Sequence, residues 1–235
     1  MTDQSSFAVV ANVFAAPLEA FAAIRQRPRI LLPLLALLVT YSAVSLVYMN
    51  SVDLPWFMEQ QIEMAAADLT QAQREAALEQ SANLSPMVLG VIGAVSSSVF
   101  ILLWTFLLAL YYTGVSFARG DGIKLKQWYA LVVWCSLPIL LGLIASLVNI
   151  LANNARFMLQ EDINPLSFRN LLSMDTEGLG MTQRILSGLD LSTVWALALT
   201  LIGYQTWTQS SIYKAAGIVL GPLVVIFGLI MVLTG

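Results

Sequence analysis

The chain has 235 residues, of which 58% are hydrophobic and only 11% are charged, and its formal net charge is -3. Globular domains are typically about 45–50% apolar and about 25% charged, so this composition excludes an ordinary soluble protein. There is no histidine and only one cysteine, Cys135, which excludes a disulfide within the chain and a zinc site built from cysteine and histidine.

Residues 1–29 form a predicted cytoplasmic, amphipathic N-terminal segment. Apolar residues recur at helical spacing from Phe7 to Ile24, and Pro17 divides the stripe they form. Proline suits the first turn of a helix, so Pro17 is predicted to open a second short helix. An amphipathic helix of this kind lies in the inner membrane interface, where nearby arginines contact anionic lipid headgroups. The candidate headgroup contacts are Arg25, Arg27 and Arg29. Ordinary anchoring by positive residues is the alternative explanation.

Residues 30–235 are predicted to form an all-α membrane domain, a helical bundle with five transmembrane helices. Each apolar run lacks Asp, Glu, Lys and Arg and approaches or exceeds the roughly 20 residues that cross a bilayer as a helix. The predicted spans are residues 30–49, 87–112, 128–151, 191–207 and 215–233. The fourth is the least apolar. In an alternative four-span arrangement, the last two segments form one crossing and a re-entrant piece.

The distribution of charge predicts the orientation of the bundle. Seven of the eleven Lys and Arg residues flank the spans on the side of the N-terminus, and four lie in the loops on the other side. Positive residues in short loops stay in the cytoplasm, so the N-terminus is predicted to be cytoplasmic and the C-terminus outside. Eleven of the fourteen carboxylates also fall outside.

The two outer loops, residues 50–86 and 152–190, are long enough to contain helices. Residues 58–80 favour helix, and Thr70 with Gln73 predicts a capping box that divides this stretch into two helices. Their acidic face suits a basic partner or a cation; a solvated face that carries no ligand is the simpler interpretation. In the second loop, Asn164-Pro165 predicts a short capped helix over residues 166–172. This loop either covers the outer mouth of the bundle or only connects two spans.

The spans contain few groups that can do chemistry. Gly217 and Gly221 form a GxxxG pattern that favours close helix packing, and Pro138 and Pro222 are candidate kinks. No carboxylate or histidine lies within a span, which disfavours proton-coupled transport. The sequence predicts no catalytic, cofactor-binding or metal-binding residues, and therefore no enzyme.

Three segments, taken in order, carry a family resemblance. They are Ala16-Pro17-Leu18-Glu19-Ala20-Phe21, Trp128-Tyr129-Ala130-Leu131 continuing to Ser136-Leu137-Pro138, and Leu189-Asp190-Leu191 with Lys214-Ala215-Ala216 downstream. With them the chain resembles the bacterial branch of the Yip family, the Ypt-interacting proteins with a five-span membrane domain. The resemblance implies a non-enzymatic, multi-pass protein of the bacterial inner membrane. Eukaryotic relatives bind small GTPases, but the Asp-Leu-Tyr-Gly-Pro motif of those relatives is missing here, so no GTPase partner is expected.

We therefore expect a partner-binding or membrane-organising accessory protein. Its expected partners are the lipid bilayer and other membrane proteins, without nucleic acid or cofactor, and a homo-oligomer is compatible with the sequence. The alternative is a channel or carrier for a small neutral solute, suggested by Asn149, Gln205 and the prolines within the third and fifth spans.

Overall fold

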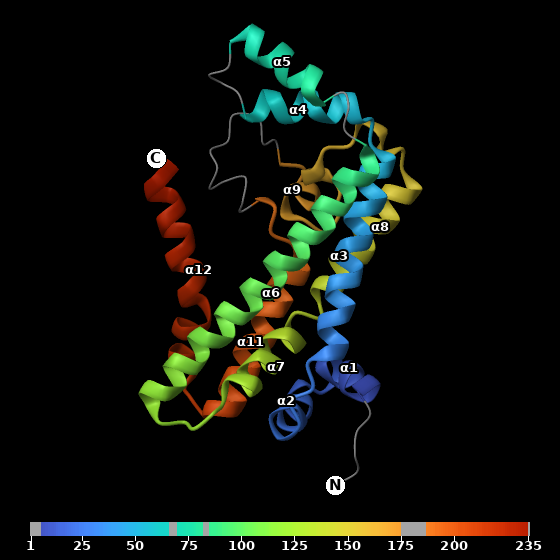
Figure 1. The fold of residues 1–235 in the computed structure, drawn as a ribbon. Helices are drawn as coiled ribbons and strands as arrows, with labels where there is room; N and C mark the ends of the chain where they lie inside the picture. Colours follow the sequence, from blue (N-terminus) through green and yellow to red (C-terminus); the bar gives the residue numbers. More distant parts are fainter. Residues whose placement is uncertain (1–5, 66–69, 82–84, 175–186, 235) are drawn as a thin grey trace.

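The protein, described by a computed structural model, is built of helices (Figure 1). The structure describes residues 6–65, 70–81, 85–174 and 187–234. Within these ranges no β-strand forms, and one isolated antiparallel bridge joins Ser167 to Asp190. The predicted all-α membrane bundle is confirmed. The helices are α1 (Ser6–Ala15), α2 (Pro17–Gln26), α3 (Leu31–Ser51), α4 (Leu54–Ala65), α5 (Gln71–Ser81), α6 (Pro86–Arg119), α7 (Leu125–Cys135), α8 (Ile139–Ala152), α9 (Phe168–Leu171), α11 (Leu191–Thr208) and α12 (Ile212–Thr234).

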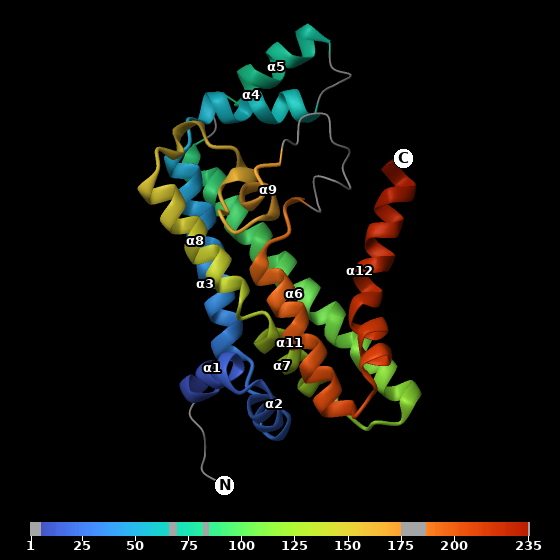
Figure 2. The ribbon, with the colours of Figure 1, turned by 180° about the vertical axis from the view of Figure 1, so that it is seen from behind.

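The long helices run between two ends of the molecule, as the opposite views in Figures 1 and 2 show. The α2 end carries α1, α2 and the turns that join α6 to α7 and α11 to α12. The α4 end carries α4, α5 and the loop that follows α8. Helix α4 lies crosswise to the long helices, with α5 packed on it.

Within the described residues, four helical segments are long and apolar enough to cross a membrane. They are α3, α6, the α7–α8 pair taken as Leu125–Ala152, and α12. Helix α11 coincides with the predicted fourth span but does not meet these criteria, because Thr193, Thr200 and Gln205 lower its hydropathy. It is nevertheless part of the bundle, since Leu199 and Trp207 are buried. Helices α11 and α12 are separate, and α12 qualifies as a span without α11.

Helix α6 continues to Arg119, about two turns beyond the expected end of the second span. It ends where Gly120 adopts a left-handed conformation with φ of 73°. The backbone N–H of Asp121 then donates to the carbonyl oxygen of Ser116 at 3.1 Å, the bond that closes a Schellman motif. Glycine takes this conformation without a Cβ clash, so the position of Gly120 determines the end of the helix.

The expected third span is two helices. Helix α7 ends at Cys135, residues 136–138 form a turn, and α8 begins after Pro138. Seven of the eleven residues of α7 are buried, which makes it the central helix of the bundle.

The N-terminal helices pack on the bundle. Pro17 opens α2, as expected, and Phe21 and Ile24 are buried against α11 and α7. The indole N–H of Trp207 donates to the carbonyl oxygen of Phe21 at 2.8 Å. Leu18, expected on the same apolar stripe, is 61% exposed, because Pro17 breaks the helical register between α1 and α2. Much of the apolar stripe therefore contacts protein.

A cluster of aromatic rings fills the core at the α2 end. Trp128 of α7 lies with its ring centroid 5.4 Å from each of Tyr112, Tyr204 and Trp207. These residues come from α6, α7 and α11, so the cluster joins three helices. Contacts of this geometry contribute about 0.5–1.5 kcal/mol beyond burial alone.

Phe21→Ala removes a fully buried ring from α2. We expect it to lower the free energy of unfolding by about 3 kcal/mol, the usual cost of truncating a buried phenylalanine. Unfolding of the full-length protein in mixed micelles measures this loss. Leu18→Ala, on the exposed side of the same helix, is the matched control. Equal losses in the two variants would contradict the packing of α2 on the bundle.

Candidate functional site

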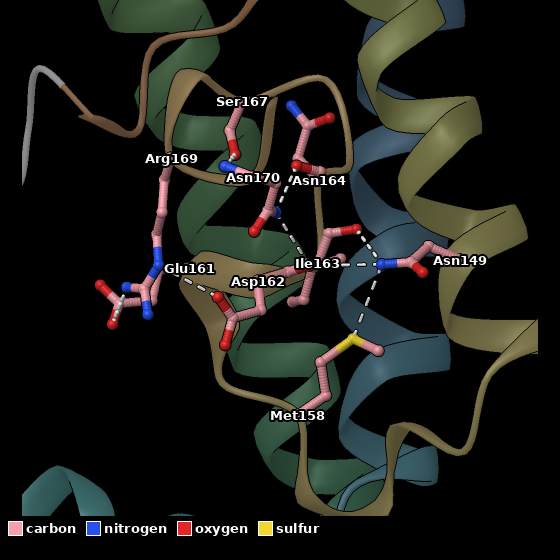
Figure 3. A network of polar contacts seen from close by, with 9 residues as sticks. All are labelled: Asn149, Met158, Glu161, Asp162, Ile163, Asn164, Ser167, Arg169 and Asn170. Carbon is pink, nitrogen blue, oxygen red and sulfur yellow. Dashed lines mark hydrogen bonds and ion pairs between the residues drawn. The ribbon is translucent and has the colours of Figure 1, made fainter. Parts of the chain in front are cut away.

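The loop that follows α8 folds back onto the helices, through polar side chains that they present. Asn149 of α8 donates from Nδ2 to the carbonyl oxygens of Ile163 at 2.9 Å and Asp162 at 3.2 Å (Figure 3). The Tyr48 hydroxyl of α3 donates to the carbonyl oxygen of Met158 at 2.8 Å. Two helices thus satisfy backbone carbonyls of the loop, which lets the loop pack against them.

Side chains within the loop hold its shape. Arg169 pairs with Glu161 and, at 3.1 Å, with Asp162 (Figure 3). Asn170 donates to the carbonyl oxygens of Asp162 at 3.2 Å and Asn164 at 2.8 Å. The short helix of this loop is α9, with Ser167 as its N-cap and not the expected Asn164. Asn164 instead accepts from the backbone N–H of Leu166 and closes a turn before α9.

Asp190 is a buried carboxylate at the start of α11, only 6% exposed. Its Oδ1 accepts from the backbone N–H of Thr193 at 2.7 Å and from the Ser192 hydroxyl at 2.8 Å. Its Oδ2 accepts from the Asn164 amide at 2.6 Å. The helix dipole also favours a negative charge at this position. Asp190 therefore caps α11 and ties it to the loop.

Asp190 lies deep in the bundle. A Cβ placed on Gly142 of α8 would lie 2.5 Å from Asp190 Oδ2, so glycine is required where α8 passes. Leu189, which precedes Asp190, lines a cavity together with Trp104 of α6. Trp104 and Gly142 lie near the midpoints of two candidate spans. The loop therefore dips between the helices to about half their length.

Sequence reasoning missed this carboxylate, because Asp190 falls outside every apolar run. The signal that was available is the Asp190-Leu191-Ser192-Thr193 sequence, in which an aspartate three residues before a threonine precedes an apolar helix. That pattern predicts an N-cap. It does not predict the depth of the cap, which depends on how the loop folds.

The same loop holds helix α4. Arg156 pairs with Asp53, its Nε and Nη2 donating to Asp53 Oδ2 at 3.0 and 2.9 Å. The Asp53 backbone N–H donates to the carbonyl oxygen of Arg156 at 2.8 Å, and the Trp56 ring meets the Phe157 ring edge-on at 5.7 Å. The hydrogen bonds from Arg156 and from the Trp56 backbone lower the pKa of the Asp53 carboxyl below its ordinary value. The start of α4 is thus fixed to the loop.

Helices α4 and α5 form an acidic hairpin, defined here by residues 54–65 and 71–81. One half of the predicted capping box is present: the Thr70 backbone N–H donates to Gln73 Oε1 at 2.9 Å, and the Thr70 hydroxyl donates to the same oxygen at 3.0 Å. Four glutamates of the hairpin are exposed, namely Glu59, Glu63, Glu75 and Glu79. No metal cluster of three or more His, Cys, Asp or Glu residues occurs in the described ranges.

The three expected headgroup contacts lie at the α2 end. Arg25 is partly buried and donates from Nη1 to the carbonyl oxygen of Trp207 at 2.9 Å. Arg27 and Arg29 are exposed. The carbonyl oxygen of Arg29 accepts from the Trp134 indole N–H at 2.6 Å. The structure brings Arg25 into the bundle and leaves the other two side chains at its surface.

Of the expected packing and kink residues on α12, Gly221 and Pro222 contact α6 and Gly217 does not. A Cβ on Gly217 would meet no atom within 4 Å, so in the part of the chain that the structure describes Gly217 and Gly221 do not pack together against one helix. Gly221 faces Tyr111 of α6, whose hydroxyl would lie 3.3 Å from such a Cβ. Pro222 lacks the N–H that would bond to the carbonyl oxygen of Ile218, and the Tyr111 hydroxyl donates to that carbonyl at 3.1 Å. Gly221 and Pro222 thus mark one contact between α6 and α12.

A model of the Yip1 domain family matches residues 11–233 of the chain. The matched range includes the long helices, the acidic hairpin and the loop that follows α8. Neither a curated protein nor a solved structure gives a match.

Asp190→Ala leaves the donors of Asn164, Ser192 and Thr193 without their acceptor. Loss of an N-cap costs about 1 kcal/mol, and each unpaired buried donor adds roughly 1–3 kcal/mol, so we expect a loss of stability of about 3 kcal/mol or more. Hydrogen exchange should accelerate over residues 155–172. Glu79→Ala, at an exposed carboxylate, is the control. Unchanged exchange in the Asp190 variant would contradict the role of Asp190 in holding the loop.

Acidification should release α4 only at low pH. Because the pKa of Asp53 is lowered in the folded state, the ion pair contributes fully above the ordinary value of 3.8 and is lost as pH falls through the lower folded value. A spin label at Glu63→Cys, in a Cys135→Ser background, reports the mobility of α4. We expect mobility to rise below pH 3.8. Asp53→Asn should abolish this response, and a response that persists in that variant would assign it to other carboxylates.

Proposed function

The chain belongs to the Yip1 domain family, and from this membership we propose that it is a non-enzymatic accessory protein that binds other membrane proteins. The acidic hairpin is the proposed contact surface. The observation that carries the proposal is that this hairpin is fixed at its base by Asp53 and Arg156 while its four glutamates stay exposed.

The spacing of these glutamates favours a binding role over a role in helix stability. Glu59 and Glu63 are four residues apart on α4, and Glu75 and Glu79 are four residues apart on α5. Like charges at this spacing destabilise a helix by roughly 0.2–0.5 kcal/mol per pair. A basic surface on a partner would remove this repulsion, because each lysine or arginine would face a carboxylate.

We assign the α4 end to the outer side of the membrane and the α2 end to the cytoplasm. Arg25, Arg27, Arg29, Arg119, Lys124, Lys126 and Lys214 flank the helices at the α2 end. Retention of positive residues in the cytoplasm supports this orientation. In our proposal the fifth crossing is made of two parts: α11, whose 18 residues reach about 27 Å from Asp190 towards the α2 end, and the loop after α8, which covers the depth between Asp190 and the α4 end. Neighbouring helices then shield its hydroxyl and amide groups from lipid.

The proposed location is the inner membrane of a bacterium, as a multi-pass protein. Arg27 and Arg29 are the proposed contacts to anionic headgroups, because both are exposed at the α2 end. The partner that we propose is a membrane protein with a basic outer segment within reach of the hairpin. A homo-oligomer would be compatible with this arrangement.

Neutralising the hairpin tests the proposal. The variant carries Glu→Gln at positions 59, 63, 75 and 79 and is purified from its own host in native lipid particles, followed by mass spectrometry. Each surface ion pair contributes up to about 1 kcal/mol, so loss of the set should lower partner recovery about tenfold or more.

Glu19→Gln, at an exposed carboxylate on α2, is the matched control and should keep every partner. Insertion of both variants is checked by membrane extraction. Full recovery of all partners by the neutralised hairpin would rule out the hairpin as the contact surface.

A further inference from the structure

A cavity of about 170 Å³ lies between α6, the α7–α8 turn, α11 and α12. It extends from Tyr112 and Val219 towards Leu189 and Phe227. Trp104 and Pro222, which also line it, lie near the middle of the two spans α6 and α12. The cavity is therefore at the depth of the hydrocarbon layer and not at a membrane surface.

The wall of the cavity is mostly apolar; its polar groups are the hydroxyls of Tyr112, Ser136, Thr193 and Thr200 and the indole N–H of Trp104. Among the described residues, no Asp, Glu, Lys or Arg lines it. The Ser136 hydroxyl donates to the carbonyl oxygen of Val132 at 2.9 Å, and the Thr200 hydroxyl donates to that of Ala196 at 2.8 Å. These two hydroxyls are already engaged within their own helices. A polar solute placed here would have to find other partners for its donors, at a cost of a few kcal/mol for each unpaired group.

The contact between α6 and α12 lies next to the cavity. The Tyr111 hydroxyl bonds to the Ile218 carbonyl oxygen next to the cavity residues Tyr112 and Val219. Towards its C-terminal end, α12 diverges from α6 in both views (Figures 1 and 2). Phe100 of α6 and Val225 of α12 are 65% and 60% exposed there. Access to the cavity is thus lateral, between α6 and α12, from the half of the bundle nearer α4.

We propose that this cavity binds a segment of one acyl chain of a membrane lipid, which enters between α6 and α12 from the leaflet on the α4 side. A hydrocarbon chain matches the apolar wall and the depth of the cavity. An apolar cavity of about 150 Å³ admits a molecule the size of benzene and stays free of water. A transmembrane helix of a second copy is about 10 Å wide and is too large for a space of this size.

Photocrosslinking identifies the occupant directly. The full-length protein is reconstituted in nanodiscs that contain phosphatidylcholine with a diazirine on its acyl chain, irradiated and mapped by mass spectrometry. We expect adducts on cavity residues such as Leu197 and Leu223, beyond those on the lipid-facing residues Val224 and Val225. Adducts only on the lipid-facing residues, or crosslinks between two copies of the chain at the cavity, would overturn the proposal.

Filling the cavity provides the matched comparison. Ala196→Phe adds a ring at a residue that lines the cavity, whereas Ala198→Phe adds the same ring at an exposed position of α11. We expect the first variant to lose the cavity adducts and the second to keep them. Circular dichroism and size exclusion verify that both fold. Should Ala196→Phe fail to fold, the adduct map of the unsubstituted protein decides alone. Cavity adducts that persist in a folded Ala196→Phe protein would contradict the assignment.

Discussion

Asp190 lies beside Gly142, near the midpoint of the α7–α8 span, where a carboxylate without partners would cost several kcal/mol. Three donors meet this requirement, from Asn164, Ser192 and the backbone of Thr193. Since Asn164 belongs to the loop after α8, satisfying the carboxylate places that loop between the helices. The loop in turn carries Arg156, which holds the first turn of α4. The position of the acidic hairpin thus depends on polar contacts of the loop, from Asp190 with Asn164 inside the bundle to Arg156 at the start of α4.

The contact between α6 and α12 depends on a backbone hydrogen bond that Pro222 cannot make. Pro222 cannot donate to the carbonyl oxygen of Ile218, and Tyr111 of α6 supplies a donor in its place. Polar groups in hydrocarbon need partners within the protein, so this bond links α12 to α6 at a defined height. Towards its C-terminal end α12 diverges from α6, and the cavity lies next to their contact. Pro222, which the sequence predicted as a kink, therefore also determines where α12 meets α6.

The sequence predicted the class of fold because apolar runs and charge-free spans are strong local signals. It also predicted the start of α2 at Pro17 and the bond from Thr70 to Gln73 at the start of α5, since each depends on residues a few positions apart. It did not predict the depth of Asp190 or the pairing of Asp53 with Arg156. Those contacts join residues far apart in the chain, and no local pattern encodes them. The partner surface remains a proposal, because exposed glutamates indicate a basic partner but do not identify which protein it is.

The depth of the loop after α8 is the central claim, and a spin label at Leu189→Cys tests it most directly. The label is placed in a Cys135→Ser background in lipid bilayers, and its collisions with oxygen and with a water-soluble nickel complex are compared. Oxygen partitions into hydrocarbon, so a label within the bundle at mid-depth should relax with oxygen and be protected from nickel. Leu171→Cys, in the exposed part of the same loop, should show the reverse. A label at position 189 that is as accessible to nickel as one at 171 would contradict the account.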